Sequence, residues 1–545
     1  MKRYLFITLA ALGLLGCTEN MTEPDSPVKG ELERSYISVT LMTDDAATRA
    51  DDVDFEYGDA AERYVENVHF FLFKGDGSAF PVNGTSGKNY LSFDVRSNGT
   101  QPGETGNANE GPNVSDVKDK ILVFDNYKGE YPAYIVAVLN WDAKYIQPSY
   151  TLENLYNALA PIRNDNNHFV MSNAVYADMQ GKVVRANPIT IYNIGKTEAE
   201  ALANPIEIYV ERISAKVVIE ANGDVAGMDA TYDIEVNVGG EPVYAKVLKW
   251  ELYNDYKHSI ILKHIYPDKW GMSSEVGFLW NDPNRFRSYW AASYTGSFPA
   301  DNTFDWANGL TTSDVAYCGE NTRPAEVDSE DNEVSNPRTK VIIKAQLVDG
   351  EGNPVEVGVW YGHSYVGELA LRTEVAQLLA NELYYLDGGE HKGISATDIM
   401  LVGGFAAPEG VDAEAYEVIF QLAEEADTKE WFTYSSAEGY VAATAEAVNE
   451  RLADVDPAML YNDGMTYYYA DVRHLGRKDS DAEYGVVRNH VYKVNIATIT
   501  GLGTPVYDSD VDVEVPERPK DMHSYVAAEV RILSWKVVKN EYNVE

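Results

Sequence analysis

The chain has 545 residues, and its 44 Lys and Arg against 86 Asp and Glu give a formal net charge of −42. Because such a chain gains no affinity by neutralising phosphates, the charge argues against nucleic acid and anionic membrane surfaces as partners. A composition that is 45% hydrophobic and 12% aromatic is typical of a globular protein, and two cysteines are too few for a disulfide framework.

Residues 1–16 have the features of a secretory signal peptide. Lys2 and Arg3 precede an apolar run, Tyr4 to Leu15, which is shorter than the roughly 20 residues that span a bilayer. The ending Leu14-Leu15-Gly16-Cys17 resembles the bacterial lipobox, in which the cysteine is acylated, for example with palmitate, and becomes the new N-terminus. We therefore predict an outer-membrane lipoprotein precursor lipidated at Cys17; the alternative is an ordinary signal peptide with a chance cysteine.

The next segment predicts a tether followed by a strand. Residues 18–30 are polar and contain proline, which suits a tether. Ile37, Val39 and Leu41 alternate with polar residues, as in a half-buried strand. Residues 43–52 are small and polar without periodicity, so we expect them to be exposed.

The remaining chain contains many apolar strand-like runs and few helical ones. A break at 222–230 suggests a domain boundary, which divides the chain into 17–49 (tether and first strand), 50–222 and 223–545. Without a strand–helix–strand rhythm, the pattern predicts a mainly β chain with two antiparallel β-sandwich domains and a few short helices. The strand-like runs are Val65–Phe73, Tyr134–Leu139, Ile206–Ile219, Val247–Leu252, Ser259–His264, Lys340–Leu347, Val355–Tyr361 and Glu417–Leu422, and the helical runs are 151–160 and Leu369–Leu383.

No motif in the sequence supports catalysis. The nine histidines lack zinc spacing. Gly362–Gly367 resembles a nucleophile elbow, but Val366 stands where that turn needs glycine. Acidic runs at 328–333 and 508–512 could collect Ca²⁺, although a solvated loop explains them more simply. We predict no catalytic residues, no metal site and no cofactor.

Several segments, in order along nearly the whole chain, carry a family resemblance. Together with the lipobox and the first strands, they resemble Bacteroidales type V pilins, the FimA-like and Mfa-type fimbrial subunits. The resemblance implies transthyretin-like sandwich domains and a major fimbrial subunit exported as a lipoprotein. The segments are Thr48-Arg49-Ala50, Val65–Phe73, Val210–Val217, Arg285–Ser293, Tyr317–Thr322, Tyr484–Val494, Ile499–Pro505 and a final strand that contains Trp535.

The resemblance also implies proteolytic processing by an Arg-specific surface protease. Arg49-Ala50 is the matching bond, and it lies in a polar, small-residue stretch of the kind that proteases cut. Arg34 and Arg63 are alternatives, but cleavage at Arg34 would leave the following strand attached, and Arg63 abuts the next strand. Cleavage after Arg49 would remove Ile37, Val39 and Leu41 and would open a groove for a strand from another chain.

The C-terminus offers a candidate donor strand, at about residues 525–545. Two apolar alternations follow one another with a phase change between them, which suggests a bulge or two short strands. One could hold the subunit's own domain while the other reaches the next subunit, giving a head-to-tail homopolymer. The donor residues are Val526, Val530, Ile532, Leu533, Trp535 and Val537.

The sequence predicts several partners and leaves two alternative functions. The expected partners are further copies of the chain, anchor and tip fimbrial subunits, the protease and a host or bacterial surface receptor. A tip or accessory subunit acting as adhesin is an alternative to a stalk subunit. A second alternative is a cell-surface glycan-binding lipoprotein, because exposed aromatic residues can stack on sugars.

Overall fold

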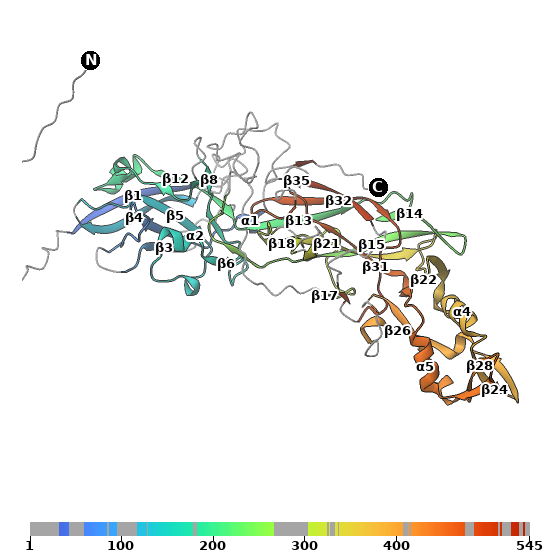
Figure 1. Cartoon of the computed structure of the whole chain (residues 1–545). Coiled ribbons are helices and arrows are strands. Elements are labelled where there is room, and N and C mark those ends of the chain that lie inside the picture. Colours follow the sequence, from blue (N-terminus) through green and yellow to red (C-terminus); the bar gives the residue numbers. More distant parts are fainter. Residues whose placement is uncertain are drawn as a thin grey trace, which may run out of the picture.

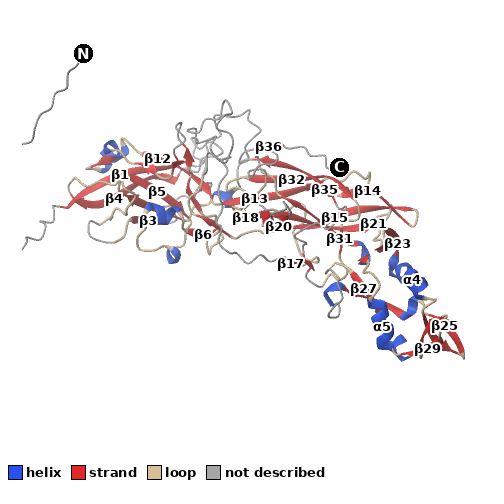
Figure 2. Ribbon diagram, viewed as in Figure 1, coloured by secondary structure: helices blue, strands red, loops and turns tan. Residues whose placement is uncertain are grey.

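Figure 1 shows the computed structural model of the chain, an elongated molecule with a β-rich body at each end of its main axis and a third body that projects from one end. Figure 2 shows that strands dominate the two main bodies and that the larger helices lie, among further strands, in the projecting one. The structure describes residues 32–42, 59–83, 87–94, 117–127, 129–177, 183–265, 303–323, 326–327, 333–335, 337–406, 413, 416–474, 484–510, 513–514, 525–533 and 538–539.

The N-terminal body is built on a nine-stranded sheet, in the order β11-β1-β12-β7-β5-β2-β3, with β4 paired to β1 and β10 to β5. Its strands are β1 (Leu32–Met42), β2 (Asn67–Phe73), β3 (Tyr90–Asp94), β4 (Val117–Tyr127), β5 (Tyr134–Leu139), β7 (Met171–Asn173), β10 (Asn187–Pro188), β11 (Ile194–Gly195) and β12 (Ile206–Arg212).

Strand β2 is buried on both faces, which explains its continuous apolar sequence. Phe70 and Leu72 point into a core that they share with β1, β4 and β12. Phe71 and Phe73 point the other way, into a second core with Trp141. A strand that is covered on both sides needs apolar residues at every position instead of an alternation.

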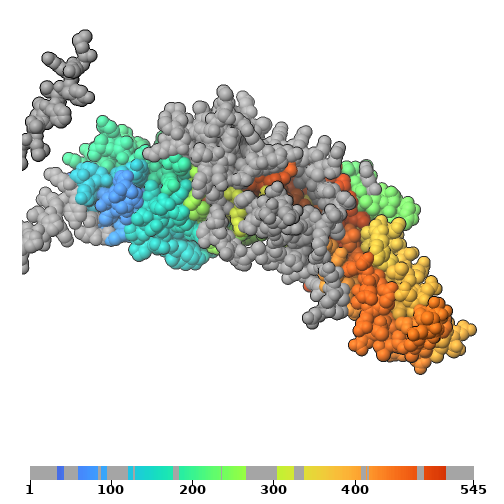
Figure 3. All heavy atoms as spheres, in the orientation of Figure 1, coloured from blue at the N-terminus to red at the C-terminus, as the bar shows by residue number. Residues whose placement is uncertain are grey.

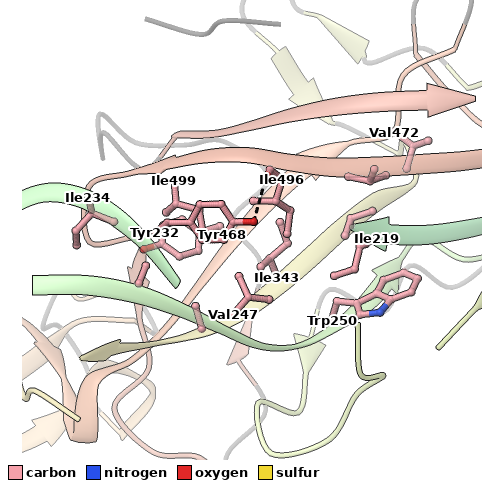
Figure 4. Packing of buried hydrophobic residues seen from close by; sticks show 14 of the residues in the cluster. Ile219, Tyr232, Ile234, Val247, Trp250, Ile343, Tyr468, Val472, Ile496 and Ile499 are labelled. Carbon is pink, nitrogen blue, oxygen red and sulfur yellow. Dashed lines mark hydrogen bonds between the residues drawn. The ribbon is translucent and has the colours of Figure 1, made fainter. Parts of the chain in front are cut away.

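The second body is a sandwich of two five-stranded sheets, in the orders β18-β13-β32-β35-β36 and β14-β15-β21-β31-β33. Figure 4 shows side chains of both sheets meeting in one core, where the Tyr232 hydroxyl donates to the carbonyl oxygen of Ile496 at 2.8 Å. The strands are β13 (Ser214–Ala221), β14 (Thr231–Val238), β15 (Glu241–Tyr253), β18 (Ala316–Gly319), β21 (Lys340–Val348), β31 (Met465–Asp471), β32 (Val491–Thr500), β33 (Thr504–Pro505), β35 (Tyr525–Leu533) and β36 (Val538–Lys539).

The projecting body is inserted between two paired strands, β21 and β31. Residues 357–463, called here the insert, have their own hydrophobic core around Trp360, Phe420 and Trp431. The insert forms the far end of the molecule in Figure 3. It contains β22 (Val357–Trp360), β23 (His363–Val366), α4 (Gly367–Leu379), β24 (Leu383–Asp387), β25 (Glu390–Gly393), β26 (Ile399–Gly403), β27 (Val418–Leu422), β28 (Trp431–Ser435), β29 (Gly439–Ala443), α5 (Ala445–Ala453) and β30 (Met459–Tyr461).

Short elements complete the described chain. They are α1 (Ala60–Arg63), α2 (Leu152–Tyr156), α3 (Glu198–Leu202), β6 (Leu159–Pro161), β8 (Tyr176–Ala177), β9 (Val183–Val184), β16 (His258–Ile260), β17 (Thr303–Phe304), β19 (Glu326–Val327), β20 (Glu333–Ser335) and β34 (Val513–Glu514), besides 3-10 turns. No described helix has the length and apolar character needed to cross a membrane.

The mainly β sandwich architecture predicted from the sequence is confirmed, with differences in detail. Two strand pairs are parallel, β1 with β12 and β13 with β32. The run Ile206–Ile219 is two strands, β12 and β13, which belong to different bodies, so the chain passes from one body to the other near Ile213, before the break at 222–230.

The strand predicted at 259–264 and the helix predicted at 369–383 are both shorter in the structure. Residues 261–264 follow β16 outside any strand, and Ile261 and Leu262 are nevertheless buried in the N-terminal body. Helix α4 ends at Leu379, so Leu383 begins β24, and Leu378 is half exposed to solvent. The run predicted as one helix is therefore a helix followed by the first residue of a strand.

Candidate subunit-assembly site

The predicted removable strand is β1, and it lies inside the N-terminal sheet with neighbours on both sides. On one side it pairs antiparallel with β4, from Leu32 opposite Tyr127 to Leu41 opposite Val117. On the other side it pairs with β11 and then runs parallel to β12. An interior strand of this kind leaves two unpaired edges when it is taken away.

The three predicted core residues of β1 are all buried. Ile37 and Val39 are 0% exposed and Leu41 is 1% exposed. They pack in the core that contains Phe70, Phe124 and other apolar residues of the N-terminal body. The alternation seen in the sequence thus marks a strand whose apolar face fills a central part of this core.

The polar side chains of β1 differ in how well they are satisfied. Ser35 is buried and its hydroxyl donates to Oδ1 of Asn126 on β4 at 2.8 Å. Arg34 forms an exposed ion pair with Asp125, at 3.1 Å. The hydroxyl of Ser38, fully buried, has no hydrogen-bond partner among the described residues.

The predicted lipidation and cleavage residues, Cys17, Arg49 and Ala50, lie outside the described residues. The two alternative cleavage positions are in regular structure. Arg34 lies within the β1–β4 pairing, opposite Asp125, and Arg63 is the last residue of α1. Proteases prefer flexible exposed segments to paired strands and helices.

The candidate donor residues divide between described and undescribed parts of the chain. Val526, Val530, Ile532 and Leu533 lie in β35, which pairs antiparallel with β32 from Tyr525 to Leu533. The register shifts once, between Ile496 and Thr498 of β32. Trp535 and Val537 lie outside the described residues. Strand β35 is thus held in the sheet of its own subunit.

A buried charge cluster, which the sequence did not suggest, lies where the two main bodies meet. The Arg488 guanidinium donates from Nε to Oε2 and from Nη2 to Oε1 of Glu320, both at 3.2 Å, and also to the carbonyl oxygens of Ile260 and Ile261. Both side chains of this ion pair are at most 1% exposed.

A second buried pair, Lys263 and Glu211, stands beside the first at 3.8 Å between Nζ and Oε2. Burial raises the pKa of Glu211 and lowers that of Lys263, because a charge in a dry environment is costly. A sequence feature that could have indicated Glu211 and Lys263 is that each is a charged residue inside an apolar strand-like run.

This junction brings together three of the segments that carry the family resemblance. Strand β13 pairs with β18 and with β32, so Val210–Val217, Tyr317–Thr322 and Tyr484–Val494 meet here. Asn321 and Val486 exchange backbone hydrogen bonds at 2.8 Å. Three of the eight segments therefore lie where the two bodies join.

The remaining candidate groups give no catalytic or metal-binding arrangement. Cys318 is fully buried and not in a disulfide, and burial raises the pKa of its thiol to about 12. In the part of the chain that the structure describes, no three His, Cys, Asp or Glu side chains are grouped so that they could hold a metal ion. Residues His363–Val366 form a strand, and not the sharp turn that a nucleophile elbow requires.

Comparisons with known proteins point to fimbrial subunits. Residues 459–541, which include β31, β32 and β35, match the family model described as major fimbrial subunit protein type IV, fimbrillin, C-terminal. No curated protein sequence matches the chain.

Solved structures show similarity only at low identity. A fimbrilin (FimA) from Porphyromonas gingivalis is 14% identical with a TM-score of 0.37, over 93% of this chain and 98% of that one. The tip fimbrial protein Mfa3 from the same organism is 12% identical with a TM-score of 0.27, over 91% and 99%. A fimbrial assembly protein from Parabacteroides distasonis is 11% identical with a TM-score of 0.27, over 74% and 100%.

These structural similarities are too weak to carry an argument, so the assignment depends on the C-terminal family match. That match includes a strand from each sheet of the second body: β32 belongs to one sheet and β31 to the other. Residues 459–541 therefore relate the C-terminal part of the chain to the fimbrillins, which supports its assignment to the type V pilins of the Bacteroidales.

Proposed function

We propose that this chain is a structural stalk subunit of a surface fimbria, exported as a lipoprotein acylated at Cys17 and polymerised by donor-strand exchange. In this proposal an Arg-specific protease at the outer membrane cuts between Arg49 and Ala50. The N-terminal strand leaves, and the C-terminal segment of another copy takes its place. The product is an extracellular head-to-tail filament, which joins anchor and tip subunits.

The observation that carries the proposal is the position of β1. It is the first described strand, it lies between β4 and β12, and its apolar residues Ile37, Val39 and Leu41 are at most 1% exposed. Burial of three such side chains contributes roughly 5–9 kcal/mol. A vacated groove would offer about the same free energy to an incoming apolar strand, together with two unpaired strand edges.

The strand that would enter the groove comes, in this proposal, from the segment after β35. Strand β35 is paired with β32 of its own body over its whole length. It would therefore act as the fixed root of the donor, and Trp535 and Val537 would belong to the part that reaches the next subunit. The parallel pairing of β1 with β12 sets the backbone pattern that an inserted strand has to meet.

The cleavage step is tested with surface-sheared material on denaturing gels, unheated and boiled, and by N-terminal sequencing. The wild-type chain should give an SDS-resistant ladder whose subunits begin at Ala50. Arg49→Ala and Arg49→Lys should both leave a folded, lipidated monomer, because an Arg-specific protease cuts neither. Arg63→Ala is the matched control and should assemble normally. Ladders from the Arg49→Ala variant would overturn the cleavage step.

The donor step is tested by deleting residues 534–545, which leaves β35 intact, and by the larger deletion of 533–545. Both variants should be secreted and cleaved but should not polymerise. Fibres that persist after either deletion would remove the donor role from the C-terminus. Oligosaccharide binding by a wild-type chain that forms no ladders would instead favour a glycan-binding lipoprotein.

A further inference from the structure

The insert ends in a four-stranded antiparallel sheet, β25-β24-β28-β29, whose two faces differ in character. This sheet lies at the extremity of the molecule in Figures 1 and 2. Its inner face is anchored in the core of the insert by Leu383 and Trp431, each 1% exposed. Its outer face, called here the aromatic face, carries Tyr384, Leu386, His391, Phe432, Tyr434 and Tyr440.

The strand register places these six side chains on one side. Residues that are directly opposite one another in an antiparallel pair project from the same face. The register pairs Tyr384 with Phe432, Leu386 with His391 and Tyr434 with Tyr440. The ring contacts agree, since Tyr440 stacks on His391 at 3.8 Å between centroids and lies 5.0 Å from both Tyr384 and Tyr434.

The aromatic face is exposed to solvent. Tyr434 is 43% exposed, Tyr440 is 45% exposed and Leu386 is 37% exposed, while Tyr384, His391 and Phe432 are partly exposed. A sheet that packs on one side and faces water on the other normally has polar residues on the wet side. Cross-strand ring contacts explain how the sheet is stabilised, but polar residues could occupy the exposed positions equally well.

The surroundings of the aromatic face are strongly acidic. Residues 357–463 contain 4 Lys and Arg against 20 Asp and Glu, a formal net charge of −16. Every one of the four cations is already in an ion pair within the insert. The pairs are Arg372–Glu368, Lys392–Asp387, Lys429–Asp398 and Arg451–Glu382.

Charge and ring chemistry favour the same kind of ligand. The face of an aromatic ring attracts cations, and the acidic insert raises the local concentration of cationic groups while it repels anionic ones. The inner face of this sheet provides an example within the chain, because Nζ of Lys429 lies 3.8 Å from the ring centroid of Tyr385. Over the rings of the aromatic face, no described Lys or Arg takes that position.

We propose that the aromatic face binds Lys and Arg side chains of a basic polypeptide partner, seated over the rings of Tyr434 and Tyr440. Five of the six side chains provide rings, three of them with tyrosine hydroxyls, and the acidic insert provides the complementary charge. This inference does not depend on polymerisation, so it can be tested on the monomeric mature chain whether or not strand exchange occurs.

The test measures binding of a fluorescent hexalysine peptide to the full mature chain at low salt, with the N-acetylated-lysine hexapeptide as the uncharged probe. Two double variants keep the charge of the protein constant. Tyr434→Leu with Tyr440→Leu removes the rings, and binding should weaken at least fivefold, given the usual strength of exposed cation–ring contacts. Tyr434→Phe with Tyr440→Phe keeps the rings, and binding should stay within about twofold.

The control variant is Val441→Thr, since Val441 is 43% exposed on the inner side of the same strand; it should bind hexalysine as the wild type does. Thermal unfolding establishes that each variant is folded. If the leucine variant is unstable, a competition measurement on the wild type replaces it. Tetramethylammonium chloride should displace hexalysine at lower concentration than sodium chloride does, because a quaternary ammonium ion itself binds aromatic rings.

Three results would overturn the proposal. Equal hexalysine binding by the leucine and phenylalanine variants would show that general acidity alone attracts the peptide. Equal displacement of hexalysine by the two salts would show that the rings do not take part in binding. Ring-dependent binding of neutral oligosaccharides, with hexalysine binding unchanged in the leucine variant, would make the face a carbohydrate surface instead.

Discussion

The guanidinium of Arg488 and the carboxylate of Glu320 form a two-contact ion pair that is sealed from solvent at the junction of the two main bodies. Arg488 also donates to the carbonyl oxygens of Ile260 and Ile261, at 2.6 and 2.9 Å. One side chain thus joins the segment before β32, the segment after β18 and the segment after β16. This contact is one of those that join the two bodies.

Breaking this pair should therefore destabilise the protein strongly. We expect Glu320→Gln or Arg488→Met to lower the free energy of unfolding by about 3–5 kcal/mol, because the remaining charge or carbonyl groups stay buried without partners. Urea denaturation measures the change. Arg34→Ala, which removes the exposed pair with Asp125, is the matched control and should cost about 1 kcal/mol or less. An equal loss of stability in Arg34→Ala and in the Glu320 or Arg488 variants would contradict the view that the buried pair stabilises the protein more than an exposed one.

Two serines of β1 should respond to alanine in opposite directions. The Ser35 hydroxyl is bonded to Asn126, so Ser35→Ala should destabilise the uncleaved precursor by about 0.5–1.5 kcal/mol. The Ser38 hydroxyl is buried without a described partner, so Ser38→Ala should stabilise the precursor by about 1 kcal/mol. The free energies of unfolding of the two serine variants can be compared by chemical denaturation, with Arg49→Ala added to each variant so that the precursor stays uncleaved. A loss of stability in Ser38→Ala would mean that its hydroxyl is satisfied.

Core substitutions in β1 should matter only before cleavage. Ile37→Ala or Leu41→Ala should destabilise the precursor by about 2–5 kcal/mol, because each leaves a cavity in a packed core. If cleavage removes the strand as proposed, the assembled fibre does not contain it, and the heat resistance of the ladder should equal that of the wild type. Val123→Ala on β4, 39% exposed, is the control and should change either state by less than about 0.5 kcal/mol. Ladders weakened by Ile37→Ala would show that β1 remains in the fibre.

Cys318 should be unreactive in the folded protein. With a thiol pKa of about 12, only about one molecule in ten thousand carries the thiolate at pH 8, and the side chain is buried. Iodoacetamide should label it only in denaturant. The raised pKa also contributes stability that is present below the ordinary value near 9 and is lost as the pH rises from 9 towards 12. Rapid labelling of the native protein at pH 8 would contradict this burial.

Assembly should not depend on attraction between charges. The chain carries −42, so copies repel one another, and in the proposed assembly the inserted apolar strand provides the contact energy. Raising the sodium chloride concentration screens the repulsion and should leave ladder formation unchanged or faster. Time courses on unheated gels at low and high salt measure this. Marked inhibition by salt would argue for ionic subunit contacts.

Much of the fold follows from local patterns in the sequence. The alternation of Ile37, Val39 and Leu41 predicts a strand with one buried face, and β1 has that face in the core. The continuous apolar run of β2 predicts burial, and its residues divide between two cores. Periodicity is reliable here because a side chain's direction depends only on its position in the strand.

Helix α4 shows where the same reasoning fails. The predicted helical run is Leu369–Leu383; Leu371, Val375 and Leu379 are buried, but Leu378 is half exposed and Leu383 lies in β24. Spacing gives the faces of an ideal helix; it does not say where the helix ends or how wide its covered face is. Those depend on which elements pack against it.

The sequence alone predicted a β-rich class, an export signal that ends at Cys17 and an apolar strand before Arg49. Only the tertiary structure decided that β1 lies between β4 and β12, that Arg488 meets Glu320, and that the rings of β24, β28 and β29 share one exposed face. The reason is physical: strand character is set by neighbouring residues, whereas pairing, burial of charge and exposure of a face are set by contacts between residues far apart in the chain, which no local pattern records.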